Sequence, residues 1–325
     1  MYSALRRAAW VAAWVVMASL PAGLAFAQTY PSKPIRLVVG FPPGGGNDIV
    51  ARLVSAKMQE SWGQAVVVDN KPGGNSIIAT EFVARSAPDG YTLLVNANGG
   101  MTINPLIYPK LPYDSQRDFV PISNVGIFPM LFVINPSLPA ATLQEFIAYA
   151  RGNPGKLNYS SGSTAFNLAT EMFKQMTGTD IRHIPYKGSG QSVQAVLAGD
   201  TQMTLVDSTA AVPLVKSGRL RALALSSAQR AGSLPDLPTM SEAGVPGYEM
   251  TLWVSFFAPA GTPGAIVSRL NAEIVRIVRL PDIREKLIAN GIEPLGNTSE
   301  QLAEMIASEI ARFRPVVQAA NIKVE

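Results

Sequence analysis

The sequence predicts an α/β protein of two domains, each a mainly parallel sheet flanked by helices, joined by two crossing strands. A length of 325 residues exceeds what one compact core usually holds. Apolar, β-branched runs alternate with amphipathic stretches, which is typical of parallel strands and covering helices. A hydrophobic content of 47% with 27 Gly and 25 Pro indicates a globular chain rich in turns and excludes disorder.

Composition removes several classes of function. The chain has no cysteine and one histidine, His183, which excludes disulfide frameworks, thiolate metal sites and a cysteine nucleophile. A multi-histidine metal site is excluded as well, and we expect neither a metal nor a cofactor. Any Ser/His/Asp arrangement has to pass through His183.

Residues 1–27 have the pattern of a secretory signal peptide. Arg6 and Arg7 give a positive start, Ala8 to Leu20 is largely apolar, and Ala25-Phe26-Ala27 matches a cleavage site. The apolar run of about 13 residues is shorter than the ~20 that a membrane anchor needs. Cleavage removes two of 27 basic residues against 23 acidic ones and leaves a net charge of +2, which predicts no nucleic acid partner. In a bacterium with an outer membrane we expect a periplasmic protein.

Strand-like and helix-like runs follow one another in two series. The first series consists of Ile35 to Val39 before Ile49 to Met58, Val66 to Val68 before Ile77 to Ala84, and Leu93 to Val95 before a turn-rich segment. The second consists of Leu157 to Tyr159 before Leu168 to Met176, Ile181 to Ile184 before Val193 to Leu197, Met203 to Val206 before Val212 to Val215, and Leu220 to Leu225.

Two apolar segments without a helical period, Phe119 to Asn135 and Tyr248 to Ala258, are interpreted as strands that cross between the domains. The helix patterns from Pro263 to Ala319 are too few for a third domain, so we expect them to pack on the first. The predicted division is 28–126 with 249–325 as domain I and 127–248 as domain II. Two extended crossings would form a hinge.

A glycine-rich loop follows the first strand and reads Phe41-Pro42-Pro43-Gly44-Gly45-Gly46-Asn47-Asp48. Glycines let the backbone approach a ligand closely, and a helix N-terminus presents unpaired N–H groups, a combination that binds anions. An ordinary N-cap at Asn47 or Asp48 would explain the same residues without a ligand. The loop lacks the Gly-Lys-Ser/Thr ending of a P-loop and the last glycine of the dinucleotide fingerprint, so ATP and NAD are not expected.

A second loop of this kind follows the strand at Leu157 and reads Ser160-Ser161-Gly162-Ser163-Thr164-Ala165-Phe166-Asn167. It offers hydroxyl and N–H donors at another helix N-terminus. The carboxyl ends of parallel strands face the ligand crevice, so we expect the two loops to face each other across a cleft. Neutral donors on both sides favour a carboxylate over a polyphosphate, and a ligand held by both loops would favour closure.

Polar residues at strand ends are further candidates. Asn98, with Asn96, either faces the cleft or forms a turn. Asp207 ends a strand and would accept a hydrogen bond from ligand or protein. Trp253 either packs at the hinge or forms a wall of the cleft. His183 alternates with apolar neighbours on a strand, and we expect a structural histidine because no catalytic partner is identifiable.

Ordered sequence blocks extend this interpretation along the mature chain: Tyr30-Pro31 with Lys33-Pro34-Ile35, Phe41-Pro42-Pro43-Gly44-Gly45-Gly46 with Asp48, Ala51 and Arg52, Val67-Val68-Asp69-Asn70-Lys71-Pro72-Gly73, Ala87-Pro88-Asp89-Gly90-Tyr91-Thr92-Leu93-Leu94, Leu111-Pro112-Tyr113-Asp114, Asn153-Pro154-Gly155-Lys156-Leu157-Asn158-Tyr159, Pro185-Tyr186-Lys187-Gly188 and Ala258-Pro259-Ala260-Gly261-Thr262-Pro263. In these blocks the chain resembles the Bug-type solute-binding receptors, the extracytoplasmic component of tripartite tricarboxylate transporters.

The resemblance implies a type II periplasmic-binding fold, a monomer, and a cleft that closes on a small carboxylate for delivery to membrane permease subunits. In that family the two loops hold the carboxylate largely through backbone groups and ordered waters, at positions that match Pro43, Gly44, Gly45, Gly46, Ser161, Gly162, Ser163 and Thr164. To these expected ligand-binding residues we add Phe41, Asp48, Asn98, Asn167 and Asp207. Asn167 stands where many relatives carry histidine, and Phe166 precedes it, so the ligand of any one relative does not carry over.

Two other functions stay open at this point. A closed receptor could address a membrane sensor kinase instead of a permease. A secreted enzyme acting on a carboxylate would use His183 as its base, although no G-x-S-x-G or H-E-x-x-H motif supports it.

Overall fold

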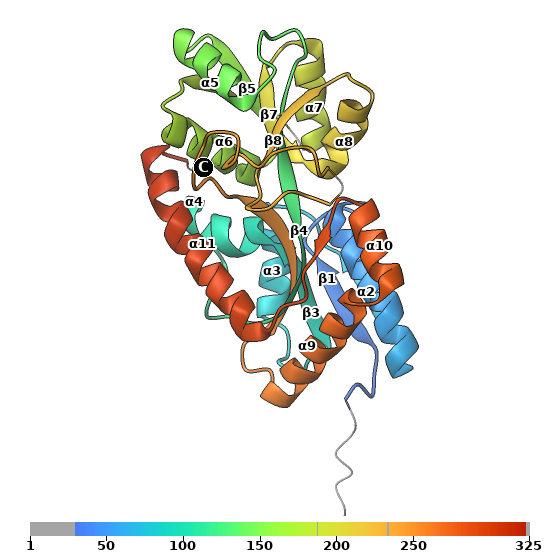
Figure 1. Cartoon of the computed structure of the whole chain (residues 1–325). Helices are drawn as coiled ribbons and strands as arrows, with labels where there is room; N and C mark the ends of the chain where they lie inside the picture. The colour runs from blue at the N-terminus through green and yellow to red at the C-terminus, as the bar shows by residue number, and fades with distance from the viewer. Residues whose placement is uncertain (1–29, 187, 233, 323–325) are drawn as a thin grey trace, which may run out of the picture. The chain divides into compact units, whose positions relative to one another are not determined.

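The computed structural model describes residues 30–186, 188–232 and 234–322 (Figure 1). The predicted signal peptide lies outside the described residues. The chain from Lys33 onward forms one compact unit, which contains all the helices and strands described. Within the described part of the chain, no helix combines the length and the apolar character needed to cross a bilayer.

The first three strands are parallel, as the alternating pattern predicts. β1 (Ile35–Val39) lies between β2 (Val66–Asn70) and β3 (Thr92–Ala97). Helices α2 (Gly46–Trp62) and α3 (Ile77–Ala84) connect them, and β3 leads into a π-helical turn, η1 (Gly99–Ile103), and the short α4 (Asn104–Ile107). β1 is almost entirely apolar because a central parallel strand is covered on both faces.

The second series of strands repeats the parallel arrangement. β5 (Leu157–Ser161) lies between β6 (Ile181–Pro185) and β7 (Met203–Asp207). α5 (Leu143–Gly152) precedes these strands, and α6 (Thr164–Thr177), α7 (Ser189–Ala198) and α8 (Ser208–Lys216) each begin where one of them ends.

Two antiparallel strands join the two series. β4 (Phe119–Ile134) pairs with β9 (Thr251–Pro259) up to Pro129, and from Met130 on it pairs with β7 and with β8 (Arg221–Leu225). The result is one ten-stranded sheet in the order β2-β1-β3-β9-β4-β7-β5-β6, with β8 and the short β10 (Glu293–Pro294) also paired to β4. The predicted α/β fold with two crossing strands is confirmed, whereas the exact domain bounds stay a prediction.

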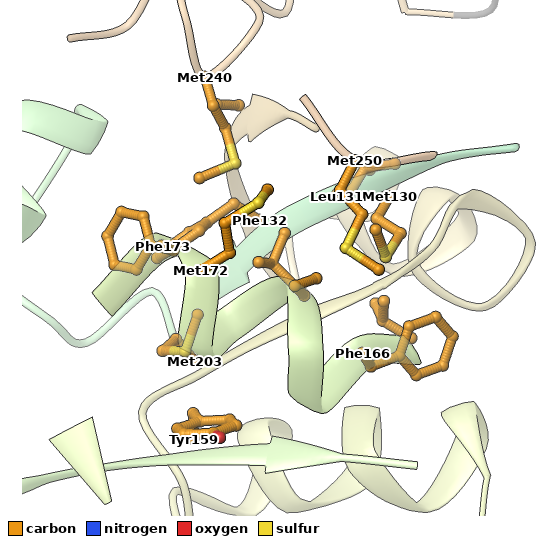
Figure 2. Close-up of a cluster of buried hydrophobic side chains, with 14 of the residues drawn as sticks. Met130, Leu131, Phe132, Tyr159, Phe166, Met172, Phe173, Met203, Met240 and Met250 are labelled. Carbon is orange, nitrogen blue, oxygen red and sulfur yellow. The ribbon is translucent and has the colours of Figure 1, made fainter. Parts of the chain in front are cut away.

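The second series has a core rich in methionine and aromatic side chains (Figure 2). Phe132 on β4 meets Phe146 and Phe173 edge-on, with ring centroids 5.0 Å apart in both pairs. Edge-to-face contacts at this separation are favourable for aromatic rings. Phe132 of β4 therefore anchors both α5 and α6 on the same face of the sheet.

The C-terminal helices cover the first series, and the last one also reaches the second. α9 (Gly264–Val278) packs on α2 and β4, and α10 (Pro281–Ala289) follows it. α11 (Ser299–Ala319) packs on β4 and η1 but also on α6, where the Gln175 side-chain amide donates to the Val316 carbonyl at 3.2 Å. The sequence pattern predicts only the contacts with the first series.

A buried carboxyl group on α11 ties this helix to β9. Glu309 is 5% exposed, and the indole N–H of Trp253 lies 3.0 Å from both of its carboxyl oxygens. Thr102 Oγ1 lies 3.0 Å from Glu309 and also 3.0 Å from the carbonyl oxygen of Asn98. A hydroxyl has one hydrogen to donate, so both Thr102 contacts form together when Glu309 is protonated and donates to Thr102. Burial raises the pKa of Glu309 to about 7, in agreement with this arrangement.

We expect Glu309 to make stability fall as pH rises. Because its folded pKa of about 7 lies above the ordinary 4.5, the folded protein holds a proton that the unfolded chain has lost between these values. Stability should therefore decrease from about pH 4.5 to pH 7, by roughly 3 kcal/mol from this group, and level off above. Urea unfolding at pH 5 and pH 8 measures the effect. Glu309→Gln should flatten the slope and the exposed Glu304→Gln should not; equal slopes in all three proteins would contradict the assignment.

Candidate functional site

A cavity of about 420 Å³ lies where the loops at the carboxyl ends of both strand series meet the crossing strands. Eight of the residues predicted from the sequence line it: Phe41, Pro43, Gly45, Gly46, Asn98, Gly162, Ser163 and Asp207. The two loops therefore do face one space, as expected. Five predicted residues are not on its wall: Gly44, Asp48, Ser161, Thr164 and Asn167. Ligand contact by any of these residues stays a prediction.

The first loop is held in place by Asp48, which does not cap its own helix. Its carboxylate accepts hydrogen bonds from the Gly44 N–H at 2.9 Å, the Asn70 amide at 2.9 Å and Arg52 Nε at 2.8 Å. Burial alone would raise the pKa of Asp48, but these hydrogen bonds outweigh it and hold the pKa below its usual value. Gly44 has φ +85°, a conformation that favours glycine.

With Asp48 engaged in this way, the N-terminus of α2 opens on the cavity. Gly45 is its N-cap, no side chain caps it, and Gly45 and Gly46 both line the wall. A Cβ at Gly46 would lie 2.6 Å from the Phe128 ring, so the ring packs directly on the backbone there. The loop thus presents backbone N–H groups beside an aromatic side chain.

The second loop also depends on close backbone packing. A Cβ at Gly162 would lie 2.2 Å from the carbonyl carbon of Gly188, and the Gly188 N–H donates to the Gly162 carbonyl at 3.1 Å. Ser163 is the N-cap of α6 and its hydroxyl accepts from the Phe166 N–H at 3.4 Å. α7 begins at Ser189 with Gly188 as its N-cap and without a side-chain cap.

Ser161 and His183 form a pair away from the cavity wall. Ser161 Oγ lies 2.7 Å from His183 Nε2, and the imidazole stacks on Tyr159 with centroids 4.8 Å apart. Burial lowers the pKa of His183, so the ring is neutral at neutral pH. Ser161 is 3% exposed, and among the described residues no carboxylate is hydrogen-bonded to the imidazole. This pair supports a structural histidine, as the sequence indicates.

Asp207 and Asn167, two polar residues predicted to bind the ligand, have different surroundings. Asp207 lies on the wall, where it caps α8 through the Ala210 N–H at 3.1 Å and accepts from the hydroxyls of Ser189 and Thr209. Asn167 instead turns to the protein, with its Oδ1 2.6 Å from the Tyr159 hydroxyl. Asp207 is the one charged side chain among the described residues of the wall.

The floor of the cavity comes from the crossing strands and is apolar. Phe128 on β4 and Leu252 on β9 are register partners, and Trp253 follows Leu252. Phe41, on the first loop, and Phe166, in the first turn of α6, line the same cavity. Trp253 lines the cavity, and its indole N–H binds Glu309 of α11.

Sequence reasoning missed several residues of the wall. They include Asn75, Ala97, Gly99, Phe128, Ser189, Thr209, Ala210 and Leu252, as well as Asn47, which the sequence suggests only as an N-cap. A signal for Asn75 was present, because Gly73-Gly74-Asn75-Ser76 joins a parallel strand to a helix just as the two predicted loops do. Phe128 and Leu252 carry no such signal, since apolar residues of a crossing strand look the same whether they face the core or a cavity.

Comparison with known proteins agrees with the geometry. A family model described as tripartite tricarboxylate transporter family receptor matches residues 50–322. Protein BugT of Bordetella pertussis is 38% identical over 303 residues, 92% of this chain and 93% of BugT. A solved R. palustris protein with adipate has a TM-score of 0.81 at 36% identity and covers 90% of this chain and 99% of its own. MatC from Rhodopseudomonas palustris, with bound malate, has a TM-score of 0.76 at 31% identity, over 89% of this chain and 100% of MatC.

Replacing Asp48 by alanine should loosen the first loop. The Gly44 N–H and the Asn70 amide would lose their acceptor, at an expected cost of about 1–3 kcal/mol in unfolding free energy at pH 7. Because the folded pKa of Asp48 is below 3.8, the contribution is present above pH 3.8 and is lost as pH falls further. Denaturant unfolding between pH 3 and pH 7 measures it. Asp69→Ala, on β2 next to Asn70 but outside the loop, is the control; equal losses in both variants would contradict this role.

Proposed function

The chain belongs to the family of tripartite tricarboxylate transporter receptors, and on that premise we propose that its cavity captures a small carboxylate for delivery to the membrane subunits of such a transporter. The family consists of receptors and the protein is not an enzyme. The observation that carries the proposal is a wall in which two helices, α2 and α7, begin at the cavity without a side-chain cap. Backbone N–H groups at such ends bind carboxylates.

The lack of cationic side chains on the described wall argues against a highly charged anion. No described residue of the wall is a lysine, an arginine or a histidine. An anion is then held by backbone N–H groups and by neutral side chains such as Asn47 and Ser163. A polyphosphate would lack the cations that usually bind it.

The apolar floor favours a ligand with an apolar body. The side chains of Phe128 and Leu252 on the floor, and of Phe41 and Phe166 beside it, offer no hydrogen bond to a hydroxyl placed against them, whereas methylene groups or an aromatic ring can pack there. A buried polar group without a partner costs about 1–3 kcal/mol. Adipate, found in one related structure, has a chain of methylene groups, whereas malate, found in another, carries a hydroxyl. For this chain we propose a carboxylate with an aliphatic or aromatic body.

The predicted signal peptide supports a place in the periplasm, and the family resemblance supports a monomer that meets the permease when loaded. The alternative of a sensor-kinase partner has no separate support in the cavity or in the family match. Delivery to the transporter is therefore the proposed output.

The binding proposal is tested on the chain from Gln28 to Glu325, unfolded and refolded to remove any bound ligand. Thermal shift and calorimetric titration are run with adipate, benzoate, malate and citrate. We expect stabilisation by adipate or benzoate to exceed that by citrate; at about 100 times the dissociation constant, a ligand adds roughly 2.7 kcal/mol. A folded, ligand-free protein that none of the four acids stabilises would contradict carboxylate capture.

Gly45→Asp should abolish this stabilisation. A side chain fits there, since a Cβ at Gly45 would lie 3.7 Å from its nearest neighbour, the Pro42 carbonyl oxygen, but the new carboxylate would occupy the anion site. We expect the affinity to fall at least tenfold by like-charge repulsion at the helix N-terminus. Gly152→Asp, where a Cβ meets open space away from the cavity, is the matched control and should bind normally. Equal affinity of both variants would exclude the α2 N-terminus as the anion site.

A further inference from the structure

The loop between β2 and α3 has an unusual backbone. Gly73, Gly74, Asn75 and Ser76 follow one another with φ values of 130°, 55°, 52° and 70°. Such values are rare for residues other than glycine, and Asn75 and Ser76 are two of the three non-glycine cases in the described chain. Ser76 is the N-cap of α3, but its side chain makes no cap hydrogen bond, and its buried Oγ has no partner. The loop is therefore not held by local capping.

The side chain of Asn75 ties this loop to residues distant in sequence. Its amide nitrogen donates to Asn104 Oδ1 at 2.6 Å and to Thr164 Oγ1 at 3.0 Å. Asn104 is fully buried, and its own amide donates to the Asn75 carbonyl at 3.0 Å and to the Tyr113 hydroxyl at 3.2 Å. Tyr113 in turn donates to the Gly100 carbonyl at 2.7 Å. This buried network fixes the direction in which the Asn75 amide points.

The bond to Thr164 joins the two strand series beside the cavity. Asn75 lines it from the first strand series, and Thr164 is the first residue of α6, on the loop that belongs to the second series. We propose that Asn75 is a latch: its hydrogen bond to Thr164 holds the two walls together and slows the exchange of the ligand. The effect on ligand exchange rests on the proposed function, whereas the hydrogen bond between Asn75 and Thr164 does not depend on it. It also gives Thr164 a role as the acceptor of the latch.

The first test measures ligand exchange with adipate as the probe. Asn75→Gly removes the amide and tolerates the left-handed backbone, and Thr164→Val removes the acceptor while leaving the rest of the loop sequence intact. Each should raise the dissociation rate roughly 2- to 10-fold, the range for one neutral hydrogen bond, with little change in the association rate. Stopped-flow tryptophan fluorescence follows the exchange, with Trp253 on the wall as a reporter.

Two controls separate a latch from general loosening. Thr164→Ser keeps the hydroxyl and should exchange adipate at the wild-type rate. The double variant of Asn75→Gly with Thr164→Val should be no faster than the faster single variant, because both substitutions remove the bond between Asn75 and Thr164. Unchanged dissociation in the single variants, or additive effects in the double one, would overturn the proposal.

A second measurement does not need a ligand. The chain has no cysteine, so Ala56→Cys on α2 and Ala198→Cys on α7, both exposed, carry spin labels at unique sites on the two sides. In the ligand-free protein, Asn75→Gly should broaden or lengthen the distance distribution, and Thr164→Ser should leave it unchanged. An unchanged distribution in Asn75→Gly would overturn the latch. A changed distribution in a protein that binds no carboxylate would support the latch and contradict the proposed function.

Discussion

The continuity of β4 is the constraint on which the rest of the structure depends. This strand of 16 residues pairs with β9 along its first part and with β7 and β8 along its last part. Both strand series are therefore joined in one hydrogen-bonded sheet. Because parallel strands deliver their loops at their carboxyl ends, this shared strand brings two sets of loops to the same place. Phe128 lies on β4 just before the pairing changes, and so it becomes the floor between those loops.

Close contacts at this floor explain why the loops are built from glycine. Phe128 occupies the space of a side chain at Gly46, and the backbone of Gly188 does the same at Gly162. Charged groups serve mainly to shape the loops: Asp48 holds the first loop from behind, and Asp207 caps α8. Apart from Asp207, whose carboxylate is hydrogen-bonded to protein donors, the wall consists of backbone groups, amides, hydroxyls and apolar side chains, a composition that suits a compact anion with an apolar body.

The sequence predicts the parallel strands, the crossing segments and the two glycine loops, because each has a local signature in periodicity or in glycine content. It does not predict the direction in which polar side chains point. Asp48, Ser161 and Asn167 look like wall residues in the sequence, yet all three bind protein atoms, since their partners Asn70, His183 and Tyr159 are set by tertiary packing. The role of Asn75 depends on a positive φ and on a partner 89 residues away, and neither is visible in a local pattern.

The absence of cationic side chains from the described wall has an electrical consequence. Binding of an anion lowers the net charge of the protein by the full charge of that anion, and neutral donors leave this charge without a cationic side chain beside it. The sequence without its first 27 residues carries only a small net positive charge, and a dianion would bring it close to zero. A bound anion therefore changes the electrostatic field around the protein beyond the cavity itself, and this change acts on charged molecules before any surface contact forms.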